Sequence, residues 1–146
     1  MTEGTAPGRA PGPPGLVQGH AFESFDWGDV TVEGADCAME MAVTPRVVNS
    51  SGVLQGGLLA TLIDMVAGVS LLRGDRPYAR SATSEMQISF LAGARVGPVR
   101  AEARVLRRGY RSAVVRVDVY DAGADNLYVA AATLTFSVKP VEAAPG

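Results

Sequence analysis

The sequence predicts an α+β domain in which a curved antiparallel sheet of about five to six strands wraps around one long central helix. Two observations support this prediction. An apolar segment of helical length, from about Gly56 to Leu72, carries one charged side chain. Several segments in the second half alternate apolar and polar residues with a period of two, which is typical of strands with one covered face. A helix this apolar needs cover, and one curved sheet provides it.

The first half of the chain supplies two strands and the helix. Residues 22–32 predict a first strand, at an edge of the sheet and interrupted near Gly28, and residues 36–43 predict a second. A turn rich in Asn, Ser and Gly then leads into the helix. The segment 73–77, Arg-Gly-Asp-Arg-Pro, has Gly and Pro where helices end.

The second half is predicted to be strands separated by turns that contain Gly. The four segments are 82–91, 99–107, 112–120 and 127–138. In the third of them the apolar residues at 113, 115, 117 and 119 share one face, whereas Arg116 and Asp118 lie on the other. This alternation indicates antiparallel strands with one face covered and one face in water.

Composition limits the classes of protein that fit. The 146 residues are 47% hydrophobic and 19% charged, with a net charge of −2, which argues against a nucleic-acid binder that depends on phosphate contacts. One cysteine, Cys37, excludes an internal disulfide and fits a cytoplasmic location. With one histidine, His20, it cannot form a zinc site of the common type, so no metal is expected. Cys37 is expected to be a buried thiol and His20 to be inert.

The ends of the chain predict no folded structure of their own. Residues 1–20 are rich in Pro and Gly and lack the apolar region of a secretory signal, so they are predicted to be a disordered tail. Residues 21–140 form the single predicted domain, and residues 141–146 a flexible C-terminus. The apolar segment 54–72 approaches membrane-spanning length, but Asp64 near its centre would cost roughly 2.5–3.5 kcal/mol on insertion scales. A buried helix of a protein that does not enter membranes is therefore preferred.

The start and the middle of this helix carry the features with chemical meaning. Gly56 and Gly57 stand where free backbone N–H groups and the positive end of the helix dipole can hold an oxygen that becomes negative. Asp64 is a lone acid in an apolar segment, where desolvating a carboxylate is costly unless it has a purpose. An acid and an oxyanion site on one helix indicate acyl-transfer or hydrolytic chemistry.

These residues resemble the hotdog-fold acyl-CoA thioesterases of the phenylacetate-pathway type and their mammalian mitochondrial-associated relatives. The pattern of that family is Asn, a short turn, His-Gly-Gly and an acid nine residues after the His. This sequence has Asn49, then Gln55-Gly56-Gly57, then Asp64, with the spacing kept. The resemblance covers roughly Met41 to Val138 and implies the hotdog fold.

The resemblance also implies roles for individual residues. Asp64 would attack the thioester or activate water, and the sequence does not choose between the two. Gly57, with Gly56 beside it, would be the oxyanion donor, although both glycines also suit a close approach of helix to sheet. Gln55 replaces the family's histidine, so it can exchange hydrogen bonds but cannot take up a proton. Helix capping is its alternative role.

Three further polar residues are candidates with competing explanations. Asn49 would orient the substrate carbonyl or the attacking water, but an Asn in a turn often bonds its own backbone. Thr83 matches a hydroxyl residue that holds the catalytic water in some members, and the alternative is a plain strand threonine. Ser84, next to Thr83, is a candidate substrate contact.

A basic turn between two strands is the candidate site for CoA phosphates. It contains Arg107, Arg108, Gly109 and Arg111, and a solvated turn is the competing interpretation. The expected function is an acyl-CoA thioesterase that works as a homodimer or a dimer of dimers, with CoA as part of the substrate and no cofactor. The alternative is a non-catalytic hotdog protein that binds acyl-CoA or acyl carriers, because the family's histidine is missing.

Overall fold

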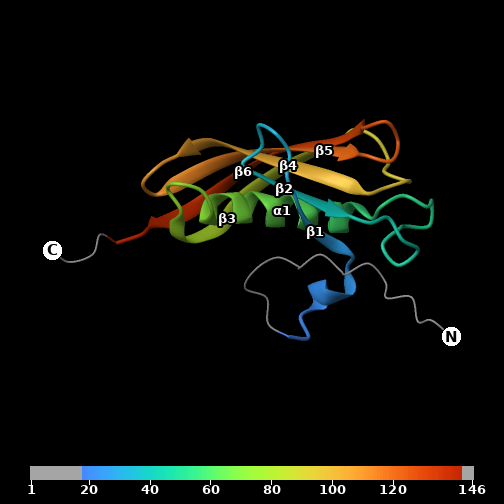
Figure 1. Cartoon of the computed structure of the whole chain (residues 1–146), viewed down its shortest axis with the longest axis horizontal. Coiled ribbons are helices and arrows are strands. Elements are labelled where there is room, and N and C mark those ends of the chain that lie inside the picture. Colours follow the sequence, from blue (N-terminus) through green and yellow to red (C-terminus); the bar gives the residue numbers. More distant parts are fainter. Residues whose placement is uncertain (1–17, 143–146) are drawn as a thin grey trace.

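A six-stranded antiparallel sheet curves around one long helix in the computed structural model, which describes residues 18–142 (Figure 1). The helix is α1 (Gly56–Leu72), and a short 3₁₀ helix, η1 (Ala21–Ser24), precedes the sheet. The strands are β1 (Trp27–Val30), β2 (Cys37–Met41), β3 (Tyr78–Phe90), β4 (Val99–Arg108), β5 (Ser112–Asp121) and β6 (Leu127–Pro140). Their order across the sheet is β1-β2-β4-β5-β6-β3, and every neighbouring pair is antiparallel. This architecture confirms the predicted fold class.

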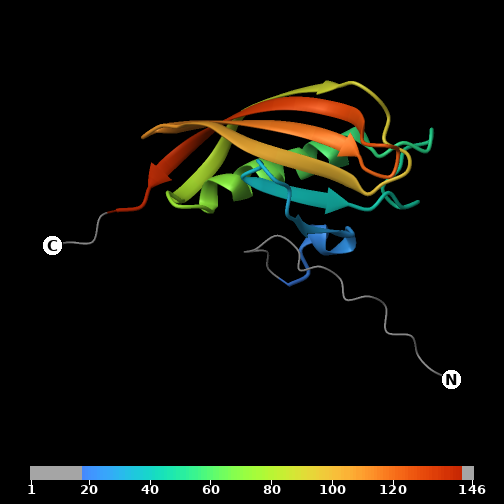
Figure 2. The ribbon, with the colours of Figure 1, turned by 45° about the horizontal axis from the view of Figure 1, so that its top comes forward.

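The core lies between the concave face of the sheet and α1. Figure 2 shows the sheet curving over this helix. From the helix, Leu62, Ile63 and Val66 are fully buried. From the sheet, the residues predicted to share one face of β5 are all fully buried: Ala113, Val115, Val117 and Val119. The predicted helix has the observed bounds, and it ends at Arg73, which has extended backbone angles and precedes Gly74 at φ +89°. The hydrophobic pattern of the sequence therefore predicted both the buried face of β5 and the extent of α1.

The predicted first strand, residues 22–32, is wrong in its first part. The chain forms η1 there, capped by the His20 ring, whose Nδ1 accepts the Phe22 N–H at 3.1 Å. Phe22 and Phe25 pack against the buried Trp27 ring, with centroid distances of 5.1 and 5.9 Å. The aromatic residues that favoured a strand instead form a cluster, and β1 is only four residues long and continues through Gly28 without interruption.

The expectations for the two ends of the chain stay predictions. The tail predicted at 1–20 and the flexible end predicted at 141–146 fall mostly in residues 1–17 and 143–146, which lie outside the described part. Within residues 18–142, no helix combines the length and the apolar character that crossing a bilayer requires. In β2, away from the ends, the Cys37 thiol is buried, as predicted.

Strand β3 forms one edge of the sheet. It is 13 residues long, pairs with β6 on one side, and is exposed along most of its length. Its pairing with β6 shifts between Thr83 and Glu85, which leaves Ser84 as the extra residue of a bulge. Bulges re-aim side chains locally, and this one lies beside the helix that carries the candidate acid.

Candidate active site

Asp64 and Thr83, which the sequence offered as separate candidates, form a hydrogen-bonded pair. The Thr83 hydroxyl donates to the Asp64 carboxylate, with 2.6 Å between Thr83 Oγ1 and Asp64 Oδ1. Asp64 is half-buried in the middle of α1, and Thr83 is exposed on β3, so the bond joins the helix to the edge strand. The pair leaves the second carboxylate oxygen, Oδ2, for another partner.

The bulge in β3 separates the roles of two neighbouring hydroxyls. Thr83 pairs with Phe136 of β6 and bonds the helix, whereas the Ser84 hydroxyl donates to the Thr135 carbonyl of β6 at 3.0 Å. The Ser84 hydroxyl thus bonds within the sheet, whereas the Thr83 hydroxyl bonds the candidate acid. The structure brings Thr83, and not Ser84, to Asp64.

The glycine pair forms the first turn of α1. An α-helix leaves the N–H groups of its first residues without an intrahelical acceptor, and these groups carry the positive end of the helix dipole. A methyl group placed on Gly57 would meet no atom within 4 Å, and one on Gly56 would lie 3.7 Å from the Phe90 ring, an ordinary contact. Within this chain, neither glycine is needed for a close approach of helix to sheet. Gly57 is also exposed, which leaves the start of the helix open to a ligand.

Local hydrogen bonding in the turn before the helix accounts for the side-chain oxygen of Asn49 but not for the side chain of Gln55. Asn49 Oδ1 accepts the N–H groups of Ser51 and Val53, at 2.9 and 3.2 Å, so the local interpretation holds for this oxygen. Gln55 is the residue before the helix, its side chain makes no capping hydrogen bond, and it is exposed. Capping therefore does not explain Gln55, which directly precedes the glycine pair in the chain.

Comparison with known proteins decides the family. A family model described as "Thioesterase superfamily" matches residues 51–127, more than half of the chain. The chain belongs to the thioesterase superfamily. The matched segment contains the glycine pair, Asp64 and Thr83, and the six-stranded sheet around one helix is the hotdog architecture that the sequence predicted.

Two curated thioesterases and one solved structure show how close the relationship is. Acyl-coenzyme A thioesterase 13 of Homo sapiens is 35% identical over 81 residues, which cover 55% of this chain and 57% of that protein. The medium/long-chain acyl-CoA thioesterase YigI of Salmonella typhimurium is 28% identical over 102 residues, 61% of this chain and 64% of its own length. A Bacillus halodurans protein crystallised with CoA is 28% identical, with a TM-score of 0.59 over 69% of this chain and 66% of that one. The match thus spans less than two thirds of each of these proteins.

The basic turn of this superfamily member lies at the other end of α1. Arg108 is tied to the end of the helix, since it donates to the Ser70 carbonyl at 3.1 Å and to the Arg76 carbonyl at 2.9 Å. Its guanidinium also lies 5.6 Å from the centre of the Tyr78 ring. Gly109 is required by the tight turn, because a methyl group there would lie 2.6 Å from the Ser112 carbonyl oxygen.

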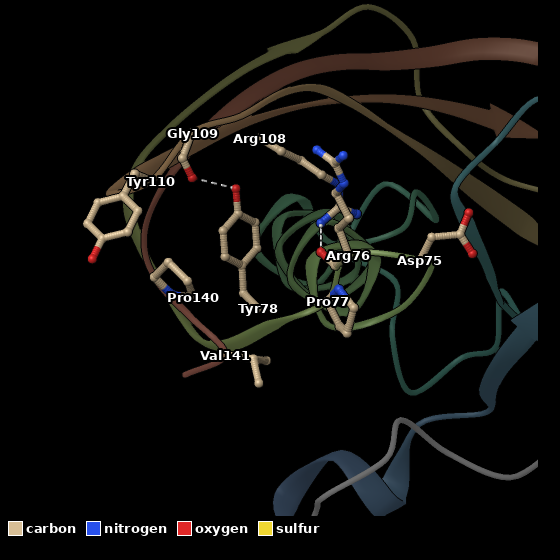
Figure 3. Close-up of a pocket in the computed structure, with 9 residues that line it drawn as sticks. All are labelled: Asp75, Arg76, Pro77, Tyr78, Arg108, Gly109, Tyr110, Pro140 and Val141. Atoms are coloured by element: carbon tan, nitrogen blue, oxygen red, sulfur yellow. Dashed lines mark hydrogen bonds between the residues drawn. The ribbon is translucent and has the colours of Figure 1, made fainter. Parts of the chain in front are cut away.

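A cavity of about 580 Å³ opens beside this turn (Figure 3). Its lining residues are Asp75, Arg76, Pro77, Tyr78, Arg108, Gly109, Tyr110, Pro140 and Val141. Arg107 and Arg111, the two other arginines of the turn, are exposed, and so is Arg108. Arg108 differs from them in its contacts, because its guanidinium donates to backbone carbonyls at the end of α1.

The distances along α1 separate three groups of candidates. Asp64 is seven residues after Gly57, about 10 Å along the axis, and Ser70 is six residues further, about 9 Å. The glycine pair, the acid and the basic turn are therefore spaced along the helix and not gathered at one point of the chain. Cys37 takes no part, since burial raises the pKa of its thiol and so disfavours the thiolate.

Sequence analysis did not single out a buried acid, Asp121. Its position continues the alternation of β5, so the period of two places a carboxylate on the buried face, and Asp121 is 1% exposed. That pattern was the available signal.

Proposed function

We propose that this chain hydrolyses acyl-CoA thioesters to a carboxylic acid and free CoA. The observation that carries the proposal is the Asp64–Thr83 pair on the helix whose first turn contains the exposed Gly57. Thioester hydrolysis requires at least a carboxylate and an oxyanion donor that reach the same carbonyl. The printed activities of the relatives, acyl-CoA thioesterases, support the same reaction.

The proposed steps assign each group an atom to handle. The Gly57 N–H polarises the thioester carbonyl and holds the oxyanion. Asp64 either takes a proton from the attacking water or attacks the carbonyl carbon itself, and both alternatives stay open. In the first, water oxygen bonds to carbon, Asp64 Oδ2 receives the proton, and collapse of the oxyanion expels the CoA thiolate, which takes that proton. Thr83 holds Oδ1 and so orients the carboxylate. No cofactor enters these steps.

The substrate-binding groups are proposed from charge and exposure. Arg107 and Arg111 are exposed cations suited to the phosphates of CoA. Gln55 and the side-chain amide of Asn49 precede the glycine pair in the chain, and we propose that they contact the acyl carbonyl. A cytoplasmic location agrees with the free thiol of Cys37.

The active site is proposed to lie between two copies of the chain. A reacting carbonyl needs its oxyanion donor and its attacking group both about 3 Å away, whereas Gly57 and Asp64 of one helix are about 10 Å apart. A two-fold axis can place Asp64 of one copy beside Gly57 of the other. The exposed edge of β3 supports this arrangement, because an unpaired edge is a template for pairing with another chain, and β3 carries Thr83.

A thiol-release assay over a panel of acyl-CoAs, including aryl and medium-chain substrates, tests the proposed function. We expect release of free CoA from at least one member of the panel. If none is hydrolysed while CoA still binds, the chain is instead a non-catalytic acyl-CoA or acyl-carrier binding protein, the alternative that the Gln55 replacement raised.

Restoring the family residue in Gln55→His is expected to change turnover of at least one acyl-CoA several-fold. The exposed Gln55 side chain makes no capping bond, so its exchange should leave the melting temperature nearly unchanged while adding a group that titrates near neutral pH. Rates across the panel check the change in turnover, and a thermal melt checks the unchanged melting temperature. An unchanged substrate profile would place Gln55 outside the pocket.

A further inference from the structure

Asp121, at the end of β5, binds the loop between β3 and β4 through hydrogen bonds. One carboxylate oxygen, Oδ2, accepts the backbone N–H groups of Arg95 and Val96, at 2.9 and 3.1 Å. The other, Oδ1, accepts the Gly97 N–H at 2.7 Å. The carboxylate is almost fully buried at the end of β5, and these backbone N–H groups replace the water that it has lost.

The charge of Asp121 is maintained by the same hydrogen bonds. Burial alone would raise its pKa, but the N–H groups of Val96, Gly97 and Arg95 outweigh burial and hold the pKa below its ordinary value. Asp121 is therefore ionised at neutral pH. Hydrogen bonds to a charged acceptor are roughly twice as strong as neutral ones, so the loop between β3 and β4 is firmly anchored.

The anchored loop touches the turn that leads into α1 at three points. The Ala94 carbonyl accepts the Leu54 N–H at 2.9 Å, and the Arg95 side chain donates from Nη1 to the Ser51 carbonyl at 2.6 Å. Gly93 lies so close to the Val53 side chain that a methyl group there would be 3.0 Å from it. The glycines proposed to form the oxyanion site follow this turn directly.

We propose that Asp121 and Arg95 are positioning residues for the oxyanion site. Asp121 fixes the backbone at 95–97, the side chain of Arg95 and the carbonyl of Ala94 fix residues 51–54, and these residues set where the Gly57 N–H points. The catalytic part of this inference rests on the proposed function. A misplacement of about 1 Å far from the chemistry can cost about a hundredfold in rate, so such support matters for turnover.

Arg95→Gln separates this role from general stability, because Arg95 is exposed. We expect the melting temperature to change little and kcat to fall about tenfold, with KM nearly unchanged, since a displaced oxyanion donor weakens the transition state more than the bound substrate. Arg95→Lys, which keeps one donor within reach of the Ser51 carbonyl, should recover part of the rate. The matched control is Arg73→Gln, which removes an exposed arginine paired with Asp29 at the opposite end of α1 and should leave kcat unchanged.

Hydrogen exchange tests the positioning without activity. In Arg95→Gln and Asp121→Asn, amides of residues 52–57 should exchange several-fold faster than in the wild type, while the amides of β4 and β5 and the Arg73→Gln protein stay unchanged. Unaltered exchange of residues 52–57, or a kcat of Arg95→Gln equal to that of Arg73→Gln, would overturn the proposal. If the wild type hydrolyses no acyl-CoA, the proposed function fails, and the exchange result still decides whether these residues hold the turn.

Discussion

Asp64→Asn should lower kcat by at least about a hundredfold without unfolding the protein. Removing a general base or a nucleophile typically costs at least that much, and the Asn side chain has neither the charge nor the basicity of the carboxylate. Asn keeps the size of Asp and an oxygen that can accept the Thr83 hydroxyl, which is now 2.6 Å from Asp64 Oδ1. The loss should therefore appear in the rate and not in the melting temperature.

The comparison is sharpest with a second Asp→Asn exchange on the same chain. Asp125 is exposed in the turn between β5 and β6 at φ +54°, a backbone conformation that Asn tolerates well. Asp125→Asn should retain wild-type turnover. Near wild-type kcat in Asp64→Asn, with thermal melts equal for both variants, would show that Asp64 is structural and that the proposed mechanism is wrong.

Two inactive variants should restore activity when they form mixed dimers. Asp64→Asn lacks the acid, and Gly57→Pro lacks the backbone N–H proposed as the oxyanion donor. Proline is tolerated in the first turn of a helix, and the space around Gly57 is open, so the second variant should fold. If each site combines Gly57 of one copy with Asp64 of the other, a mixed dimer has one intact site and one with both defects.

The expected activity of verified mixed dimers is about half that of the wild type, since one of the two symmetry-related sites works. Differently tagged chains, co-expressed and purified through both tags, provide the material, and each homodimer serves as the inactive control. Mixed dimers without activity would mean that both groups act within one chain, which the separation of about 10 Å along α1 makes difficult.

Periodicity predicted most of the fold because burial decides it. The buried face of β5 follows the alternation from Ala113 to Val119, and the apolar segment became α1 with its predicted ends. Residues 22–25 escaped prediction because tertiary packing on Trp27 overrode the strand preference of Phe22 and Phe25.

The candidate site was predicted as residues but not as connections. Asp64, Thr83 and the glycine pair came from type and spacing, whereas the bond between Asp64 and Thr83 depends on a bulge that no local pattern announces. Asp121 and its loop lie 24 to 26 positions apart in sequence, and their hydrogen bonds use backbone N–H groups that every residue carries. Such contacts cannot be predicted from the sequence, because no residue type marks the backbone group that takes part in them.

If the proposed site forms between two copies that join along the open edge of β3, catalysis would depend on protein concentration. If two copies join along this strand, the interface is isologous, and a substitution on β3 acts twice, once from each copy. Dilution would then abolish activity without unfolding either chain, because the acid and the oxyanion donor are separated when the dimer dissociates. In that case the specific activity would fall as the chain concentration drops below the dissociation constant of the dimer.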